Sequence, residues 1–125
     1  MSRTKLKKFE KLPLMNNVIQ PIRDDLLNDS FYLKGGWGNQ FGNNNPIVLE
    51  LGCGKGEYTI GLAKMYPKFN YIGLDIKGSR IYSGAKQALD ENLKNVIFVR
   101  TQVEYLEALF ATNEISEMWL TFPDP

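Results

Sequence analysis

The segment that most constrains the fold is a short apolar run that leads into a glycine-rich loop and then into a helical pattern. The run covers residues 47–51, and the loop reads Gly-Cys-Gly-Lys-Gly over residues 52–56. Tyr58, Leu62 and Met65 then recur at helical spacing. Glycines at such a junction let the backbone turn sharply and approach a ligand closely. The pattern predicts a strand, a glycine loop and a helix.

Three further apolar runs alternate with helical patterns after this first unit. We expect the second helix to begin with Ser79 as its N-cap. Alternating strands and helices predict the α/β class, with a doubly wound, mostly parallel sheet and right-handed crossovers. The predicted strands cover residues 47–51, 71–76, 96–99 and 118–122, and the predicted helices cover residues 58–65, 79–89 and 103–110.

The first third of the chain has a different character. Residues 35–46 are dense in glycine and asparagine, which favour turns over regular elements. We therefore divide the chain into residues 1–46, a basic arm with a Gly/Asn-rich linker, and residues 47–125, a partial ligand-binding domain. The folded unit is expected to begin near Ile47.

Composition excludes several classes of protein. Hydrophobic residues make up 43% and charged residues 23% of the 125-residue chain, close to globular averages. No apolar run approaches the roughly 18 residues of a membrane span, and no secretory signal is present, so a cytoplasmic location is expected. The only cysteine is Cys53 and there is no histidine, which argues against a disulfide and a metal site.

Charge is distributed unevenly along the chain, although the net charge is only +1. Residues 1–23 hold six basic side chains against one acid, Glu10, whereas residues 101–125 hold five acids and no base. This asymmetry indicates either a basic arm that binds a polyanion or a solvated charged tail.

Two carboxylates flank the glycine loop in the predicted sheet. Glu50 lies just before the loop, and Asp75 lies at the end of the second strand, from which a carboxylate can accept hydrogen bonds from ribose hydroxyls. A dinucleotide fingerprint would have a small residue where this chain has Glu57. Acids around the loop suit an adenosine cofactor that carries a cation and no phosphate. The alternative is that both are strand-end carboxylates near solvent.

The fourth predicted strand ends in Thr-Phe-Pro-Asp-Pro over residues 121–125. Carboxyl ends of parallel strands face the ligand crevice, and two prolines stiffen the backbone around Asp124. Asp124 is therefore a candidate for the site, with a turn aspartate as the alternative.

Three motifs together resemble one known family. They are Glu-Leu-Gly-Cys-Gly-Lys-Gly-Glu over residues 50–57, Gly-Leu-Asp-Ile-Lys-Gly over residues 73–78 and Leu-Thr-Phe-Pro-Asp-Pro over residues 120–125. In this order and spacing they are similar to the bacterial tRNA (guanine-N7)-methyltransferases, which act on guanine 46 of the tRNA variable loop. The resemblance implies a Rossmann-like class I methyltransferase domain, truncated here after its fourth strand.

The resemblance also implies roles for individual residues. Glu50, Gly52, Gly54 and Asp75 would bind S-adenosyl-L-methionine, and tRNA would be the partner. Where many members have an acid or asparagine followed by alanine, this chain has Thr101 and Gln102, either of which can hydrogen-bond adenine. Asp124 would lie beside the reacting centre.

Two other functions remain open from the sequence. A class I methyltransferase for another acceptor would share the glycine loop and Asp75 but has no reason for a basic leader. A non-catalytic fragment is the second alternative, because an open last strand leaves unpaired edge groups and uncovered apolar surface. The sequence does not indicate an oligomeric state.

Overall fold

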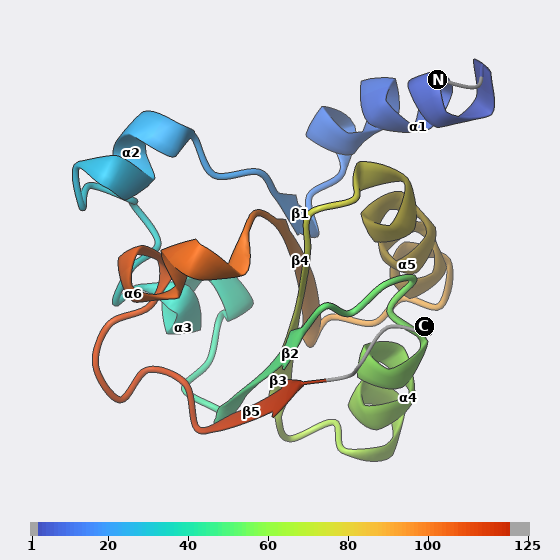
Figure 1. Cartoon of the computed structure of the whole chain (residues 1–125). Helices are drawn as coiled ribbons and strands as arrows, with labels where there is room; N and C mark the ends of the chain where they lie inside the picture. Colours follow the sequence, from blue (N-terminus) through green and yellow to red (C-terminus); the bar gives the residue numbers. More distant parts are fainter. Residues whose placement is uncertain (1–2, 121–125) are drawn as a thin grey trace.

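A computed structural model of the chain describes residues 3–120. Within that range the strands form one sheet in the order β1-β4-β3-β2-β5, and all pairs are parallel. Figure 1 shows the sheet between two groups of helices. The strands are β1 (Val18–Ile19), β2 (Ile47–Leu51), β3 (Asn70–Asp75), β4 (Val96–Arg100) and β5 (Glu117–Leu120).

The helices cover both faces of the sheet, so the predicted doubly wound α/β fold is confirmed. In Figure 1, α4 and α5 lie on one side of the strands, and α2, α3 and α6 lie on the other. The helical elements are α1 (Arg3–Lys11), η1 (Leu12–Leu14), α2 (Arg23–Leu27), α3 (Trp37–Phe41), α4 (Glu57–Met65), α5 (Gly78–Asp90), η2 (Val103–Tyr105) and α6 (Leu106–Leu109).

The hydrophobic core has two layers, one on each face of the sheet. Alternate residues of a strand point to opposite faces, so Leu49 packs in the layer under α3 and α6, and Val48 packs in the layer under α4 and α5. All residues of β2 and β3 are buried because helices cover both of their faces. The four residues of β5, at one edge of the sheet, are exposed.

The elements after residue 46 agree closely with the prediction. Strand β2 has the predicted bounds, β3 lies one residue earlier than predicted, and β4 extends one residue further. The N-cap prediction was wrong: α5 begins at Gly78 after Lys77, without a side-chain cap, and Ser79 lies inside the helix. The predicted helix over residues 103–110 is a 3₁₀ turn followed by α6. Part of the fourth predicted strand, residues 121–122, lies outside the described residues.

The first 46 residues differ more from expectation, because they contribute to the sheet and the core. Val18 and Ile19 pair with β4. The Gly/Asn-rich segment contains α3, whose Trp37 is fully buried and donates its indole N–H to the Leu109 carbonyl over 2.9 Å. Burial of this large aromatic ring outweighs the low helix propensity of its neighbours. The folded unit thus begins well before Ile47.

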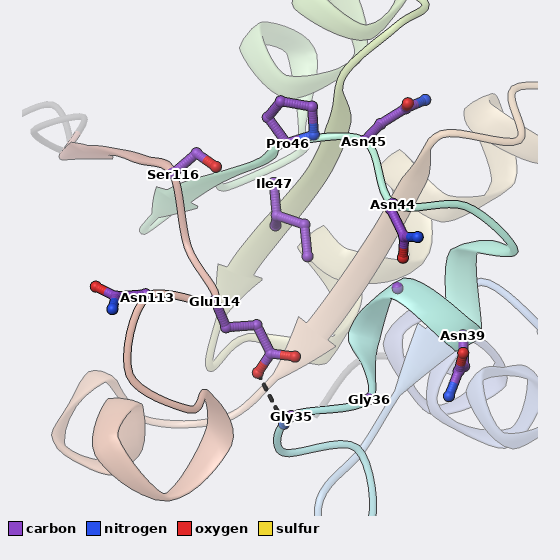
Figure 2. A pocket seen from close by; sticks show the side chains of 11 residues that line it. Gly35, Gly36, Asn39, Asn44, Asn45, Pro46, Ile47, Asn113, Glu114 and Ser116 are labelled. Atoms are coloured by element: carbon purple, nitrogen blue, oxygen red, sulfur yellow. Dashed lines mark hydrogen bonds between the residues drawn. The ribbon is translucent and has the colours of Figure 1, made fainter.

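Glu114 ties the α3 segment to the loop before β5. Its carboxylate accepts hydrogen bonds from the backbone N–H groups of Gly35 (2.8 Å), Trp37 (3.2 Å) and Ala111 (2.9 Å). Figure 2 shows Glu114 pointing toward Gly35 across a pocket of about 320 Å³. Ile47 lines this pocket, which therefore lies at the amino end of β2, away from the glycine loop. We interpret Glu114 as a structural carboxylate.

Within residues 3–120, none of the helices combines the length and the apolar character that a membrane crossing requires.

Candidate functional site

The sheet reverses its direction of winding at β2. The chain runs from β2 to β3 and β4 on one side, and then returns to place β5 on the other side of β2. In open α/β sheets the ligand crevice lies at the carboxyl ends of the strands, at such a switch point. A cleft of about 430 Å³ opens there. The site is therefore where the topology of the sheet predicts it.

The cleft brings together four of the predicted site residues from three strand ends. Gly52 follows β2, Asp75 ends β3, and Thr101 and Gln102 follow β4, and all four line the cleft. Thr101 is buried and its backbone N–H donates to the Asp75 carbonyl over 3.1 Å, whereas Gln102 is exposed. Of the last two, Gln102 is the one whose side chain is open to a ligand.

The glycine loop needs glycine for its backbone conformation. Gly52 and Gly54 have φ angles of 68° and 58°, in the region that residues with a Cβ rarely adopt. A Cβ on Gly54 would meet no atom within 4 Å, so open space lies beside the loop at this point. Gly56 differs, because a Cβ there would lie 2.7 Å from the Phe98 ring. The loop is thus packed on one side and open on the other.

Asp75 joins the glycine loop to the turn that starts α5. Its Oδ2 accepts a hydrogen bond from the Gly54 N–H, and its Oδ1 accepts one from the Lys77 N–H, each over 2.9 Å. The residue is only 8% exposed. The carboxylate of Asp75 thus accepts one backbone N–H group on each oxygen and lies at the wall of the cleft.

Glu50 lies deeper than Asp75. The residue is 5% exposed, and its Oε1 accepts a hydrogen bond from the Thr59 hydroxyl, which α4 supplies. Glu50 and Gly54 are not among the residues that line the cleft. Glu50 therefore stands behind the loop rather than at the cleft surface.

The thiol of Cys53 is buried in the loop close to two carboxylates. Burial, followed by the negative charges of Asp75 and Glu50, raises the pKa of the Cys53 thiol far above its usual range. The thiol therefore stays protonated and is a poor nucleophile. The same two carboxylates favour a cation over an anion beside the loop.

The sequence prediction missed the apolar walls of the cleft. Ile76, Val103 and Leu120 line it and are 48%, 45% and 60% exposed. Their positions at or shortly after the carboxyl ends of strands, where the ligand crevice is expected, are the signal that would have found them. Glu104 adds a further acid to the lining. The cleft thus offers apolar surface for a flat ring and carboxylates for hydroxyl or cationic groups.

Asp124, the predicted catalytic residue, lies outside the described residues. The strand that leads toward it, β5, ends at Leu120, which borders the cleft.

Several known proteins are similar to this chain in sequence. The family model described as "Putative methyltransferase" matches residues 44–125. The chain is 58% identical to a tRNA (guanine-N(7)-)-methyltransferase of Christiangramia forsetii, over 99% of the chain and 56% of that protein. It is 48% identical to one of Bacteroides thetaiotaomicron, over 100% of the chain and 50% of that protein. The chain spans about half the length of these curated relatives.

A solved structure supports the fold. The "Structure of an antibiotic related Methyltransferase" superposes with a TM-score of 0.62 at 24% identity, over 73% of this chain and 47% of that chain. The family match over residues 44–125, together with the relatives that are up to 58% identical, shows that the chain belongs to the putative methyltransferase family.

Proposed function

We propose that the protein containing this chain transfers a methyl group from S-adenosyl-L-methionine to N7 of guanine in tRNA, at guanine 46 of the variable loop. The observation that carries the proposal is the cleft at the switch point, where Asp75, Gln102 and apolar walls meet beside the glycine loop. The relatives named tRNA (guanine-N(7)-)-methyltransferase, which match almost the whole chain, support the choice of acceptor.

The residues of the cleft fit this cofactor. Ile76 and Val103 provide apolar surface for the adenine ring, and Gln102 provides an amide for its polar edge. Asp75 can accept hydrogen bonds from ribose hydroxyls, because each carboxylate oxygen has a second lone pair beyond its backbone contact. Open space beside Gly54 leaves room for close approach to the loop.

The bound cofactor would supply an electrophilic methyl group on a sulfonium ion. Guanine N7 has an available lone pair and no proton to lose, so the protein must align the base rather than remove a proton. The absence of histidine from the chain is consistent with such a reaction. Asp124 would orient the base through its N–H edge and stabilise the positive charge that develops on the ring.

The basic N-terminal segment would contact the tRNA backbone. It forms α1, which packs against α5 and carries Lys5, Lys7, Lys8 and Lys11 in exposed or half-exposed positions. Lysine contacts to phosphates position a nucleic acid without reading its sequence. A tRNA substrate also implies a cytoplasmic protein.

Methyl transfer to a tRNA transcript tests the proposal. The full-length protein and labelled cofactor should yield N7-methylguanine in the transcript, and replacement of guanine 46 by adenine should abolish the product. Transfer to another guanine, or to another base, would refute the assigned position. Transfer to small acceptors or proteins, with none to tRNA, would overturn the proposed function.

A further inference from the structure

A second cavity adjoins the cleft and has the opposite charge. Its volume is about 380 Å³, and it shares Ile76, Thr101 and Gln102 with the cleft. Its remaining lining includes Arg23, at the start of α2, and Arg100, at the end of β4. The cleft is lined by acids and this cavity by guanidinium groups, and the segment after β4 separates the two.

The Arg100 guanidinium is held in a fixed orientation. Its Nε donates to the Ile76 carbonyl over 3.3 Å, and one terminal nitrogen donates to Gln20 Oε1 over 3.1 Å. The Phe9 ring of α1 lies 4.8 Å from the guanidinium carbon, at cation–π distance. A guanidinium has five N–H groups, and two are used by acceptors within residues 3–120. Three oriented donors therefore remain for a ligand.

Within residues 3–120, no ion pair neutralises the charge of either arginine. Among the described residues, ion pairs join Lys34 to Asp29, Lys64 to Glu91 and Lys86 to Asp90. Neither Arg23 nor Arg100 forms one, although Asp24 and Asp25 directly follow Arg23 in α2. Two uncompensated guanidinium groups that line one cavity match the charge and the geometry of a phosphate.

We propose that the cavity between Arg23 and Arg100 binds a backbone phosphate of the RNA substrate, close to the nucleoside that is methylated. This inference rests on the proposed function and adds a specific contact to it. We assign the cofactor to the cleft and not to this cavity, because its sulfonium and ammonium groups suit the acids of the cleft. A phosphate in this cavity would lie on the far side of Thr101 and Gln102 from the cofactor.

Arg23→Gln is the direct test, since Arg23 is exposed and its replacement leaves the contacts of Arg100 in place. Loss of a charge-assisted hydrogen bond should weaken tRNA binding by the full-length protein by about tenfold. The slope of log affinity against log salt should fall in magnitude by about 1, as for one lost phosphate contact. Affinity for S-adenosyl-L-methionine should be unchanged.

Lys94→Gln is the matched control. It removes the same charge at an exposed position just before β4, so it lies at the other end of the strand that carries Arg100. Its tRNA affinity and salt slope should equal those of the parent.

Arg100→Lys is the second variant. It keeps the positive charge but loses the planar set of N–H donors, so it should weaken tRNA binding with little change in the salt slope.

Three results would overturn the inference. The first is that Arg23→Gln binds tRNA with the same affinity and the same salt slope as the parent protein. The second is a loss of cofactor affinity with unchanged tRNA binding, which would assign the cavity to the cofactor. The third is thermal stabilisation by inorganic phosphate that depends on Arg23, combined with a salt slope of tRNA binding that does not depend on Arg23. That result would indicate a site for free phosphate.

The same measurements separate this inference from the proposed function. Formation of N7-methylguanine by the parent, with a parental slope for Arg23→Gln, rejects the phosphate site alone. Binding of tRNA that depends on Arg23, without any N7-methylguanine, rejects the proposed reaction alone.

Discussion

The backbone N–H of Gly54 donates a hydrogen bond to Oδ2 of Asp75 over 2.9 Å, so the end of β3 holds the glycine loop in place. The other oxygen of this carboxylate accepts the Lys77 N–H at the start of α5. One buried side chain thus fixes two segments that border the cleft. We expect its removal to affect both folding and cofactor binding.

Asp75→Asn tests whether Asp75 contributes to both folding and cofactor binding. One oxygen becomes an NH₂ group that faces a backbone N–H donor, so stability should fall by about 1–3 kcal/mol. Cofactor affinity should fall by about tenfold or more. Urea unfolding and calorimetry measure the two effects. Asp90→Asn is the control, because Asp90 is an exposed partner of Lys86 at the end of α5. Unchanged cofactor affinity in Asp75→Asn would remove Asp75 from the binding site.

Thr59→Val tests the support of Glu50. Thr59 is 1% exposed, and its hydroxyl donates to the buried Glu50 carboxylate. Valine keeps the shape but removes the donor, so unfolding free energy should fall by about 1.5–3 kcal/mol, as for a hydrogen bond to a charged group. Thr59→Ser keeps the hydroxyl, so its unfolding free energy should fall by less than that of Thr59→Val. Equal urea midpoints for the parent and Thr59→Val would show that this hydrogen bond contributes nothing.

Two glycine-to-alanine substitutions in helices should have opposite effects. Gly61 in α4 has open space where a Cβ would lie, so Gly61→Ala should raise stability by about 0.5–1 kcal/mol through helix propensity. In α5, a Cβ on Gly84 would lie 2.6 Å from the Lys55 carbonyl and 2.9 Å from the Phe98 ring. Gly84→Ala should therefore cost about 1–3 kcal/mol despite the same propensity gain. Thermal melts compare the pair, and a stabilised Gly84→Ala protein would contradict the close packing.

Stability should depend on pH through Cys53 at the alkaline end. In the unfolded chain the thiol ionises near its ordinary pKa of 9.0, whereas burial and the nearby carboxylates keep it protonated in the fold. Above that pH the unfolded state binds fewer protons, so stability falls as pH rises, by up to about 1.4 kcal/mol per pH unit. Below it Cys53 contributes no slope. Urea titrations from about pH 8 to about pH 10 should show this slope in the parent but not in Cys53→Ala. Identical pH profiles would contradict the buried thiol.

Asp124→Asn addresses the chemical step. If Asp124 orients guanine and stabilises its developing charge, the substitution should lower the single-turnover rate on tRNA by about tenfold or more while cofactor affinity stays the same. Rapid-quench methylation with the full-length protein measures that rate. A parental rate would make Asp124 a structural residue.

The sequence predicted the ligand-binding half of the fold better than the rest. Strand β2 and the loop after it can be read from neighbouring residues alone. An apolar run predicts the buried strand, and the glycines after it allow the positive φ angles of the turn. Asp75 was predicted from its place at a strand end, because parallel strands gather their ends at one edge of the sheet. The positions of Thr101 and Gln102 came from the family resemblance.

The elements that were missed depend on contacts distant in sequence. Strand β1 has two residues, which is too short for any periodicity, and it exists because β4 offers an edge. Helix α3 depends on Trp37, whose indole reaches Leu109. The start of α5 also depends on a distant contact, because a Cβ on Gly78 would collide with the Phe9 ring of α1. No local pattern around Ser79 records that contact.

The parallel pairing of Val18 and Ile19 with Phe98 and Val99 affects the order in which the protein can fold during its synthesis. Strand β1 precedes the other described strands in the sequence but cannot join the sheet until β4 has been translated, so it is placed late. Until then the outer edge of β4 presents free N–H and C=O groups, and the basic segment ahead of β1 remains undocked. A nascent chain halted before residue 96 should therefore leave its first twenty or so residues open to a protease, and one halted well beyond residue 100 should protect them.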